Sequence, residues 1–462
     1  MLSVGFYSLG NGALSSRWLR DAVAIAVEAL SWMELEGLSE RQALTKTTRQ
    51  LGIENVDSMR TAFLMIMETT RALNLIDRIT TVFLDKNFLE DLDLGKRNFL
   101  RIFIWWALLR QSSRRSSIDL LEAARHVLGW RQLLDLELTF GNIMNFDTRR
   151  FLQHTEDMER IALSTFNREW FVAYCYRTFG REFALNYLRG TLSAPPNYLR
   201  INAPKDAQQS LLEEIESEGV KTVPVEELDG LFRVIQTRKP LTLTRAYKTG
   251  LFSIQDKSSY LSTTVSNPKK HETILDLCAA PGGKTAHLAL HTQNSSKICS
   301  IDISRRRFEV WKREMKRCKI SCATPIVVDA RQNLPVKQIF DLVIVDPPCT
   351  NSGAFGKTPS LKWRLTSDAL EKFTKTQWQI ICSAIQAVKP GGRLIYSTCS
   401  VTVEENEMQI ERLLRLNPEF SLQKQIPFIG QAGLRNLDYC QRLYPHLDGC
   451  NGYFVASLTR KY

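Results

Sequence analysis

From about residue 251 to the end of the chain, short apolar runs alternate with runs of helical character. Five of the apolar runs are predicted strands, at residues 274–278, 297–303, 325–328, 340–346 and 392–397. Three intervening runs are predicted helices, at residues 284–291, 305–319 and 370–388. Strands that are joined through helices run parallel, and the helices then cover both faces of the sheet. The pattern therefore predicts an α/β domain whose ligands bind beyond the carboxyl ends of the strands.

The first predicted strand leads into a turn of small residues and then into a helix. The turn consists of Cys278, Ala279, Ala280, Pro281, Gly282 and Gly283, and Lys284 follows it. Small side chains let the backbone approach a ligand closely, and a helix N-terminus attracts anions. The Gly-Lys-Thr ending does not make a P-loop, because that motif needs glycine where Cys278 stands. The turn also lacks the G-x-G-x-x-G fingerprint of dinucleotide sites.

An aspartate stands at the end of each of the next three predicted strands. Asp302 is placed to accept both ribose hydroxyls of a bound nucleoside, and Asp329 to meet an adenine amino group. Asp346 closes the series. Taken singly, each carboxylate could instead cap the helix that follows. Their succession at consecutive strand ends predicts S-adenosylmethionine as the cofactor, bound by the turn residues 278–284 and these three aspartates.

Two cysteines also follow strand ends. Cys349 stands in the sequence Asp-Pro-Pro-Cys at 346–349, and Cys399 in Ser-Thr-Cys-Ser at 397–400. Neighbouring strands would direct both thiols into one crevice, whereas an inert buried thiol is the alternative for Cys349. Carbon 5 of cytosine is methylated only after a nucleophile has added to carbon 6, and a thiolate suits that task. The pair predicts covalent methylation of a pyrimidine. An RNA amino-methyltransferase, which needs no thiol at Cys399, remains the other enzymatic reading.

The first third of the chain is predicted to be helical. It contains no proline before Pro195, and apolar residues recur at helical spacing between residues 17 and 33. A capping box begins at Ser39, with Gln42 three residues on. Further helices are predicted at 57–73, 75–84, 94–110, 117–128 and 132–143. We therefore expect a helical domain at 1–165, a linker with a small α+β segment at 166–250, and a catalytic domain at 251–462. In the small segment, strands are predicted at 198–202 and 231–236 and a helix at 208–218.

Composition constrains the partners and the chemistry. The net charge of +12 favours a polyanionic partner, nucleic acid before membrane. The ten cysteines are scattered without regular spacing along the sequence, so we expect neither a disulfide framework nor a zinc site. No bound metal is predicted. No signal peptide is visible, and the most apolar run, at 99–109, is too short to span a bilayer. We expect a cytoplasmic monomer that does not bind membranes.

The quoted motifs resemble the Sun (Fmu) family of RNA cytosine-C5 methyltransferases, which are related to the eukaryotic nucleolar Nol/Nop proteins. The resemblance covers roughly residues 195–460, including the segments 196–202, 253–259 and 452–456. The helical third is similar to the NusB-like RNA-binding domain of the members that act on ribosomal RNA. The resemblance implies a multidomain protein with an all-α NusB-like bundle, a small α+β RNA-binding segment and a Rossmann-like catalytic domain.

The resemblance also implies roles for individual residues. Cys399 would be the thiolate that adds to carbon 6, Asp346 would hydrogen-bond the base at N3, and Cys349 would act in release of the product. Lys284 would lie near the base or the cofactor. The loop at 350–353 departs from the family pattern Ser-Gly-x-Gly because its first glycine is missing. In the segment that the family uses to hold RNA, basic candidates are Arg200, Lys205, Arg233, Arg238, Lys239, Arg245 and Lys248.

The expected substrate is ribosomal RNA, with tRNA as the alternative. A reading from another class is a non-catalytic NusB-like scaffold that binds RNA but not the cofactor.

Overall fold

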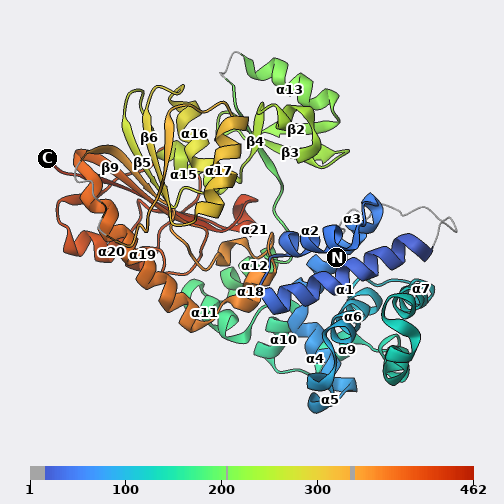
Figure 1. Ribbon diagram of the computed structural model, residues 1–462. Coiled ribbons are helices and arrows are strands. Elements are labelled where there is room, and N and C mark those ends of the chain that lie inside the picture. Colours follow the sequence, from blue (N-terminus) through green and yellow to red (C-terminus); the bar gives the residue numbers. More distant parts are fainter. Residues whose placement is uncertain (1–15, 204–206, 333, 335–338) are drawn as a thin grey trace. The chain divides into compact units, whose positions relative to one another are not determined.

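The computed structural model describes residues 16–203, 207–332, 334 and 339–462 (Figure 1). The chain divides into two compact units. The first comprises Met1–Tyr174 with Thr358–Ser360, and the second comprises Cys175–Lys357 with Leu361–Tyr462. The expectation of a multidomain chain, helical first and mixed α/β afterwards, is confirmed. The finer division at residues 165 and 250 stays a prediction. No helix in the described ranges is long and apolar enough to cross a membrane.

The first unit is built from helices around one apolar core. The α-helices are α1 (Ser16–Glu36), α2 (Glu40–Leu51), α3 (Val56–Arg71), α4 (Leu73–Phe83), α5 (Lys86–Asp91), α6 (Leu94–Ile104), α7 (Arg114–Ala124), α8 (Glu137–Ile143), α9 (Thr148–Gln153) and α10 (Asp157–Ser164). The capping box of α2 forms as predicted, because the amide of Ser39 donates to Oε1 of Gln42 at 3.1 Å. In the core, the rings of Phe103 and Phe140 pack edge to face with centroids 4.8 Å apart.

Two of the predicted helices continue as π-helical turns, and one starts differently from the prediction. The run 94–110 is α6 followed by the π-helical segment Trp105–Leu109, and 117–128 is covered by α7 followed by Arg125–Gly129. The run 132–143 begins as the 3-10 segment Trp130–Leu136 before α8. Hydrophobic spacing locates such helices but does not report a change of hydrogen-bond register.

The second unit carries a large sheet whose central strands are parallel. These are β5 (Thr273–Leu277), β6 (Lys297–Asp302), β7 (Ala323–Val327), β8 (Phe340–Val345) and β9 (Val388–Thr398), in the spatial order β9-β8-β5-β6-β7. All five predicted strands are confirmed, and their neighbours pair in parallel. Four later strands, β10 (Phe420–Leu422), β11 (Gln431–Ala432), β12 (Gln441–Leu443) and β13 (Tyr453–Arg460), extend the sheet in antiparallel fashion and were not predicted. The direction in which successive strands are added reverses between β5 and β8, where a ligand crevice is expected.

Helices cover both faces of this sheet (Figure 1). On one face, α19 (Ser367–Ala387) and α20 (Glu407–Leu416) pack on Leu275 and Val343. On the other, α15 (Lys257–Val265) and α16 (Gly283–His291) pack on Ile274 and Leu342. Helix α17 (Arg305–Arg317) lies against α16. Successive residues of β5 and β8 thus point to opposite buried faces, which explains why apolar residues stand side by side in both strands.

A four-stranded antiparallel sheet precedes the large one. Its order is β2-β3-β1-β4, formed by β2 (Val220–Pro224), β3 (Leu231–Thr237), β1 (Tyr198–Ile201) and β4 (Phe252–Ile254). Helices α13 (Gln208–Ser217) and α14 (Arg245–Lys248) accompany it. Strands β1 and β3 and helix α13 were predicted, whereas β2 and β4 were not. The predicted boundary at residue 250 therefore falls just before a strand that still belongs to this sheet. The remaining helices of the unit are α11 (Glu169–Phe179), which spans the division between the units, α12 (Arg181–Gly190), α18 (Ser360–Arg364), which begins in the helical unit, and α21 (Pro445–Asp448).

The structure corrects the prediction that Arg200 contacts RNA. Its residue exposure is 2%, and its guanidinium donates to Oε1 of Gln255 at 2.8 Å and to the carbonyl of Gly283 at 2.9 Å. Burial lowers its pKa to about 10, so the group stays charged at neutral pH. Arg200 therefore ties β1 to the start of α16. Of the other candidates, Lys239 pairs with Glu218 at 2.8 Å and Lys205 lies outside the described residues. Four candidates are exposed: Arg233, Arg238, Arg245 and Lys248.

Substitution of Arg200 is expected to lower stability rather than RNA affinity. Arg200→Gln leaves buried carbonyl acceptors without their donor, which costs about 2–4 kcal/mol. The control is Arg238→Gln, an exposed residue just after β3, with an expected change in stability below about 0.5 kcal/mol. Urea unfolding followed by tryptophan fluorescence measures both variants. Equal stabilities would show that the buried contacts of Arg200 contribute nothing.

Candidate active site

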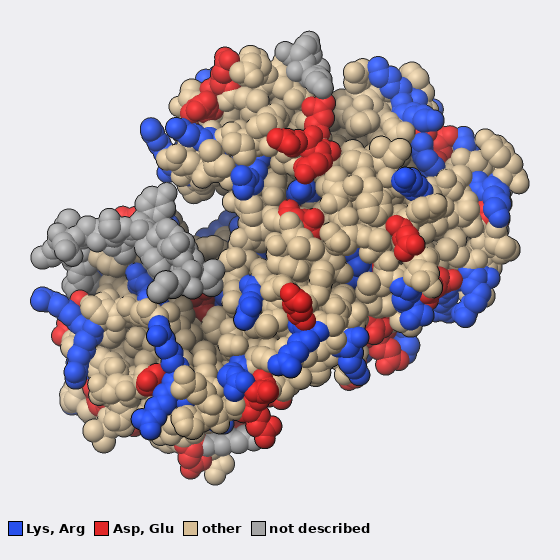
Figure 2. All heavy atoms as spheres, turned by 180° about the vertical axis from the view of Figure 1, so that it is seen from behind, with Lys and Arg blue, Asp and Glu red and all other residues tan. Residues whose placement is uncertain are grey.

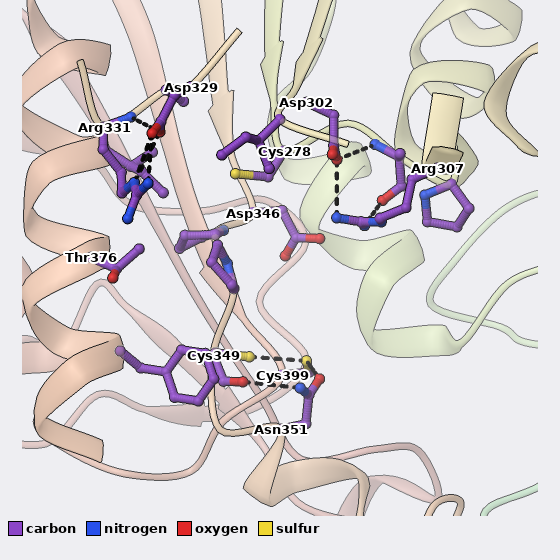
Figure 3. A pocket seen from close by; sticks show the side chains of 18 residues that line it. Cys278, Asp302, Arg307, Asp329, Arg331, Asp346, Cys349, Asn351, Thr376 and Cys399 are labelled. Carbon is purple, nitrogen blue, oxygen red and sulfur yellow. Dashed lines mark hydrogen bonds and ion pairs between the residues drawn. The ribbon is translucent and has the colours of Figure 1, made fainter. Parts of the chain in front are cut away.

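The crevice at the carboxyl ends of the parallel strands holds most of the predicted site residues. A cavity of about 620 Å³ opens there (Figure 3). Its predicted lining residues are Cys278, Ala280, Pro281, Asp302, Asp329, Asp346, Cys349 and Cys399. A second cavity of about 220 Å³ is lined by further predicted residues, Ala279, Gly283 and Lys284. Cys278, Ala280, Pro281 and Asp346 border both cavities, so the two form one continuous neighbourhood.

Gly282 has a packing role that differs from the predicted one. It lines neither of these two cavities, and its φ of 109° is in the region that favours glycine. A Cβ atom at this position would lie 2.9 Å from Cε of Met315 and 3.0 Å from Cδ1 of Trp311. The glycine therefore lets the turn pack against α17. At Gly283, by contrast, an added Cβ would meet no atom within 4 Å, so the backbone of Gly283 borders open space.

The two carboxylates expected to hold the nucleoside are each paired with an arginine. Asp302 ends β6, is buried, and accepts from the amide of Ala280 at 3.2 Å. It also pairs with Nη1 of Arg307 at 3.0 Å. Asp329 pairs with Nη2 of Arg331 at 2.7 Å, and this hydrogen bonding lowers the pKa of the Asp329 carboxyl. Neither arginine was predicted. A short-range sequence signal exists, since each basic residue follows its aspartate within five positions.

Lys284 and Asp346 form an ion pair beside the strand ends. Nζ of Lys284 donates to Oδ2 of Asp346 at 2.6 Å. Burial by itself lowers the pKa of Lys284, but the charge of Asp346 and hydrogen bonds to Asp346 and Tyr453 outweigh it, so the pKa is raised. Lys284 is therefore a fixed cation. Its contact with Asp346 places it close to the base position that the sequence predicts.

Asp276 is a buried carboxyl that the sequence analysis missed. It lies in β5, lines the smaller cavity, and accepts from Oγ1 of Thr285 at 2.6 Å through Oδ2. Its other oxygen, Oδ1, has no hydrogen-bond partner in the described structure. Burial raises the pKa of Asp276 to about 7. An unsatisfied buried acceptor beside a cavity fits a polar ligand with donor groups.

The two thiols meet, as the sequence predicts. Sγ of Cys349 lies 3.2 Å from Sγ of Cys399, and Figure 3 shows them at the end of the cavity opposite Asp302 and Asp329, with Asp346 between. Cys399 donates to Oδ1 of Asn351 at 2.6 Å. Hydrogen bonding to Cys399, together with burial, raises the pKa of Cys349 well above its usual value. Cys349 therefore holds its proton, while the half-buried Cys399 faces the cavity.

In the loop at 350–353, Asn351 stands where the family pattern has its first glycine. Asn351 adopts φ 54° and ψ 28°, a left-handed conformation that asparagine tolerates better than most residues. Its amide nitrogen donates to the carbonyl of Cys349 at 3.0 Å, while its oxygen accepts from Cys399. Asn351 thus adopts a conformation that glycine also favours, and its side chain contacts the thiol of Cys399.

The doubly wound arrangement of parallel strands, the small-residue turn into α16 and the acidic strand ends around one cavity define the fold of a methyltransferase with a nucleoside-containing cofactor. Residues 263–459 match the family model "16S rRNA methyltransferase RsmB/F". The chain is 30% identical over 312 residues to the "Probable ribosomal RNA small subunit methyltransferase B" of Bacillus subtilis, covering 66% of this chain and 69% of that protein.

Two further proteins are similar to this chain, one in sequence and one in structure. The "tRNA (cytosine(72)-C(5))-methyltransferase" of Pyrococcus horikoshii is 34% identical over 220 residues, covering 48% of this chain and 55% of that protein. A crystal structure of the protein PH0851 superposes with a TM-score of 0.81 and 27% identity, covering 95% of this chain and 98% of that one. The chain belongs to the RsmB/F (Sun) family. Its activity is S-adenosylmethionine-dependent methylation of cytosine C5 in RNA.

Proposed function

We propose that this protein methylates a cytosine of ribosomal RNA through a covalent adduct between Cys399 and carbon 6. The observation that carries the proposal is the pair of thiols 3.2 Å apart at the end of a cavity that also contains Asp302 and Asp329. One cavity thus offers a nucleophile for the base and carboxylates for a nucleoside. The proposal includes a cytoplasmic location and a monomeric enzyme.

The residues around the two cavities fit S-adenosylmethionine. Asp302 would accept the ribose hydroxyls, Asp329 would meet the adenine amino group, and the unsatisfied Oδ1 of Asp276 would accept a donor in the smaller cavity. Loop residues 278–284 would line the remainder of the site. The bound cofactor would supply an electrophilic methyl group on its sulfonium sulfur. When the nucleoside binds, the ion pairs of Arg307 with Asp302 and of Arg331 with Asp329 would break, or the carboxylates would accept hydrogen bonds from the arginine and the nucleoside together.

The protein's own groups would carry the chemistry at the base. The Cys399 thiolate adds to carbon 6, and Asp346, oriented by Lys284, hydrogen-bonds N3 and stabilises the charge that develops on the ring. Carbon 5 becomes nucleophilic through this addition. After methylation a base removes the proton from carbon 5, the double bond forms again, and the bond between sulfur and carbon 6 breaks. Cys349, with its proton retained, would assist this last step. The base must be turned out of any stacked helix to reach Cys399.

RNA binding is assigned to the small sheet and the helical unit. The exposed Arg233, Arg238, Arg245 and Lys248 offer phosphate contacts on and beside the small sheet. Figure 2 shows Lys and Arg spread over one face of the molecule and interspersed with acidic residues, so charge alone does not trace a single path for RNA. We propose that the helical unit is a NusB-like RNA-binding domain. The Pyrococcus relative keeps tRNA as the second candidate substrate.

The function is tested with purified protein, S-adenosylmethionine and two unmodified transcripts, small-subunit ribosomal RNA and a tRNA pool. Bisulfite sequencing should reveal one protected cytosine in the ribosomal transcript. Protection only in tRNA would move the substrate to the second candidate. Methyl transfer to an exocyclic amino group, or no transfer to either RNA, would contradict the proposal.

The assignment of Asp302 to the cofactor predicts a loss of affinity on substitution. Asp302→Ala removes a carboxylate that accepts hydroxyl donors, so S-adenosylmethionine should bind about 10–100-fold more weakly. Isothermal titration calorimetry measures the change. The control is Asp341→Asn. Asp341 stands near the start of β8, at the other end of the strand from the cavity, and pairs there with Lys389. Equal affinities of Asp302→Ala and the control would remove Asp302 from the site.

A further inference from the structure

A buried carboxylate connects the two cysteine loops. Glu405 has 0% exposure and lies just before α20. Its Oε1 accepts from the amide of Thr350 at 2.8 Å and from Nε2 of Gln377 at 2.9 Å. Its Oε2 accepts from three hydroxyls, those of Thr350 at 2.6 Å, Ser400 at 2.5 Å and Thr402 at 2.7 Å. Thr350 directly follows Cys349, and Ser400 directly follows Cys399. One side chain therefore binds the residue next to each thiol.

The surrounding contacts complete this connection. Gln377 also donates to the carbonyl of Pro348 at 3.0 Å, so both neighbours of Cys349 are tied to the same network. The hydroxyls of Ser352 and Ser400 are 2.9 Å apart, and the amide of Gly353 donates to the carbonyl of Cys399 at 3.0 Å. The loop after β8 and the loop after β9 are thus joined directly as well as through Glu405.

Burial of the Glu405 carboxylate costs free energy of folding, so a contribution to stability alone does not explain it. A buried carboxylate loses its hydration, and the five donors to Glu405 are all neutral. Glu407, two residues on, shows the usual solution, because it pairs with Arg442 through contacts of 2.6 and 2.5 Å. The charge of Glu405 also acts on Cys349. After hydrogen bonding to Cys399, burial and the charge of Cys399, it is a further cause of the raised pKa of Cys349.

We propose that Glu405 is a positioning residue that locks Cys349 and Cys399 at reacting distance. This inference rests on the proposed covalent function, because the distance between the two thiols matters for the reaction only if both act on the same base. A single anion fixes the loops on either side, and its charge opposes a second anion at Cys349. Cys399 is then the thiol that forms the thiolate, since two thiolates at this distance repel each other. An error of about 1 Å in such a site costs roughly 100-fold in rate.

The geometry is tested first without RNA. Diamide oxidises two adjacent thiols to a disulfide and takes up their two hydrogens, so the rate of Cys349–Cys399 linkage reports how the thiols are placed. Peptide mass spectrometry follows this one linkage among the other cysteines. We expect Glu405→Gln to slow it by at least about tenfold, because its amide group brings donors where the network needs acceptors. Glu405→Asp should show an intermediate rate.

The second measurement is methyl transfer. Glu405→Gln should lower kcat about 100-fold while KM for RNA stays within about threefold, because the contacts with RNA are unchanged. The control is Glu272→Gln, which removes a carboxylate paired with Arg393 at 2.7 Å before β5, at the other end of the sheet. If Glu405→Gln does not fold, Thr350→Val, which loses one hydroxyl of the network, takes its place with a smaller effect in the same direction.

Linkage and kcat of Glu405→Gln equal to those of the control would overturn the inference. The proposed function fails in a different way, through a Cys399→Ala variant that still methylates RNA. Slow linkage in Glu405→Gln would support the positioning role even then, because that readout involves no methyl transfer.

Discussion

Replacement of Cys399 by alanine is expected to abolish methyl transfer while leaving the cofactor and RNA bound. Without the thiolate, carbon 5 of cytosine has no route to become nucleophilic, so kcat should fall by about 10⁴-fold or more. Affinities should change little, because Cys399 contributes only one side chain to the lining of the cavity. Single-turnover transfer of labelled methyl groups measures the rate, and filter binding measures RNA affinity.

A matched control separates the thiol's chemistry from the loss of any cysteine. Cys382 is half-buried like Cys399 but lies on α19. Cys382→Ala should keep its rate within about threefold of the parent, as expected for a residue outside the site. Methylation by Cys399→Ala at the parent rate would exclude the covalent mechanism and favour direct transfer to an amino group.

Replacement of Cys349 is expected to have a different effect, the accumulation of a covalent RNA adduct. Sγ of Cys349 is buried and lies 3.2 Å from Sγ of Cys399, so the loss of Cys349 leaves the attacking thiol in place. Addition to carbon 6 then proceeds, whereas release is slowed. On a denaturing gel, Cys349→Ala should carry a band of protein joined to RNA that survives boiling in detergent.

The double variant Cys349→Ala with Cys399→Ala is the control for this result. It should show no adduct, since the nucleophile is gone. A Cys349→Ala variant that turns over normally, with no retained RNA, would leave Cys349 as a packing residue. An adduct that persists in the double variant would place the covalent bond on another side chain.

The strands of the catalytic sheet illustrate how far the sequence is informative. Parallel strands of this kind are covered on both faces, so β5 and β8 stand out as runs in which most residues are apolar. Strand β4 is three residues long, and β2 mixes lysine, threonine and proline with valine, so neither produces a clear pattern. The antiparallel strands β10 to β12 are as short. Strands β10 and β12 pair with β13, and β11 pairs with β12, and local spacing of residues does not report such pairing.

The errors at individual residues have the same origin. Arg200 belongs to a basic segment, and charge alone does not tell which face of β1 its side chain occupies. The burial pattern places it inside, where Gln255 and the carbonyl of Gly283 receive it. The assignment of Gly282 to the ligand stays a prediction, and its packing against α17 could not be read from the turn sequence. Glu405 was not singled out at all, because its five donors come from three separate segments.

The sequence by itself determined the class of chemistry: a turn of small residues, three acidic strand ends and two cysteines in order along alternating strands and helices. Each of these features can be recognised in a short stretch of sequence. In a parallel sheet the carboxyl ends of the strands lie at one edge, so the residues that follow them come together there. Only the tertiary structure decided which groups cooperate. Three contacts depend on side-chain directions and burial. They are the approach of the two thiols to 3.2 Å, the ion pair of Lys284 with Asp346, and the hydrogen bonds of Glu405 to both cysteine loops. These are set by packing between segments far apart in the chain, and no short stretch of sequence encodes them.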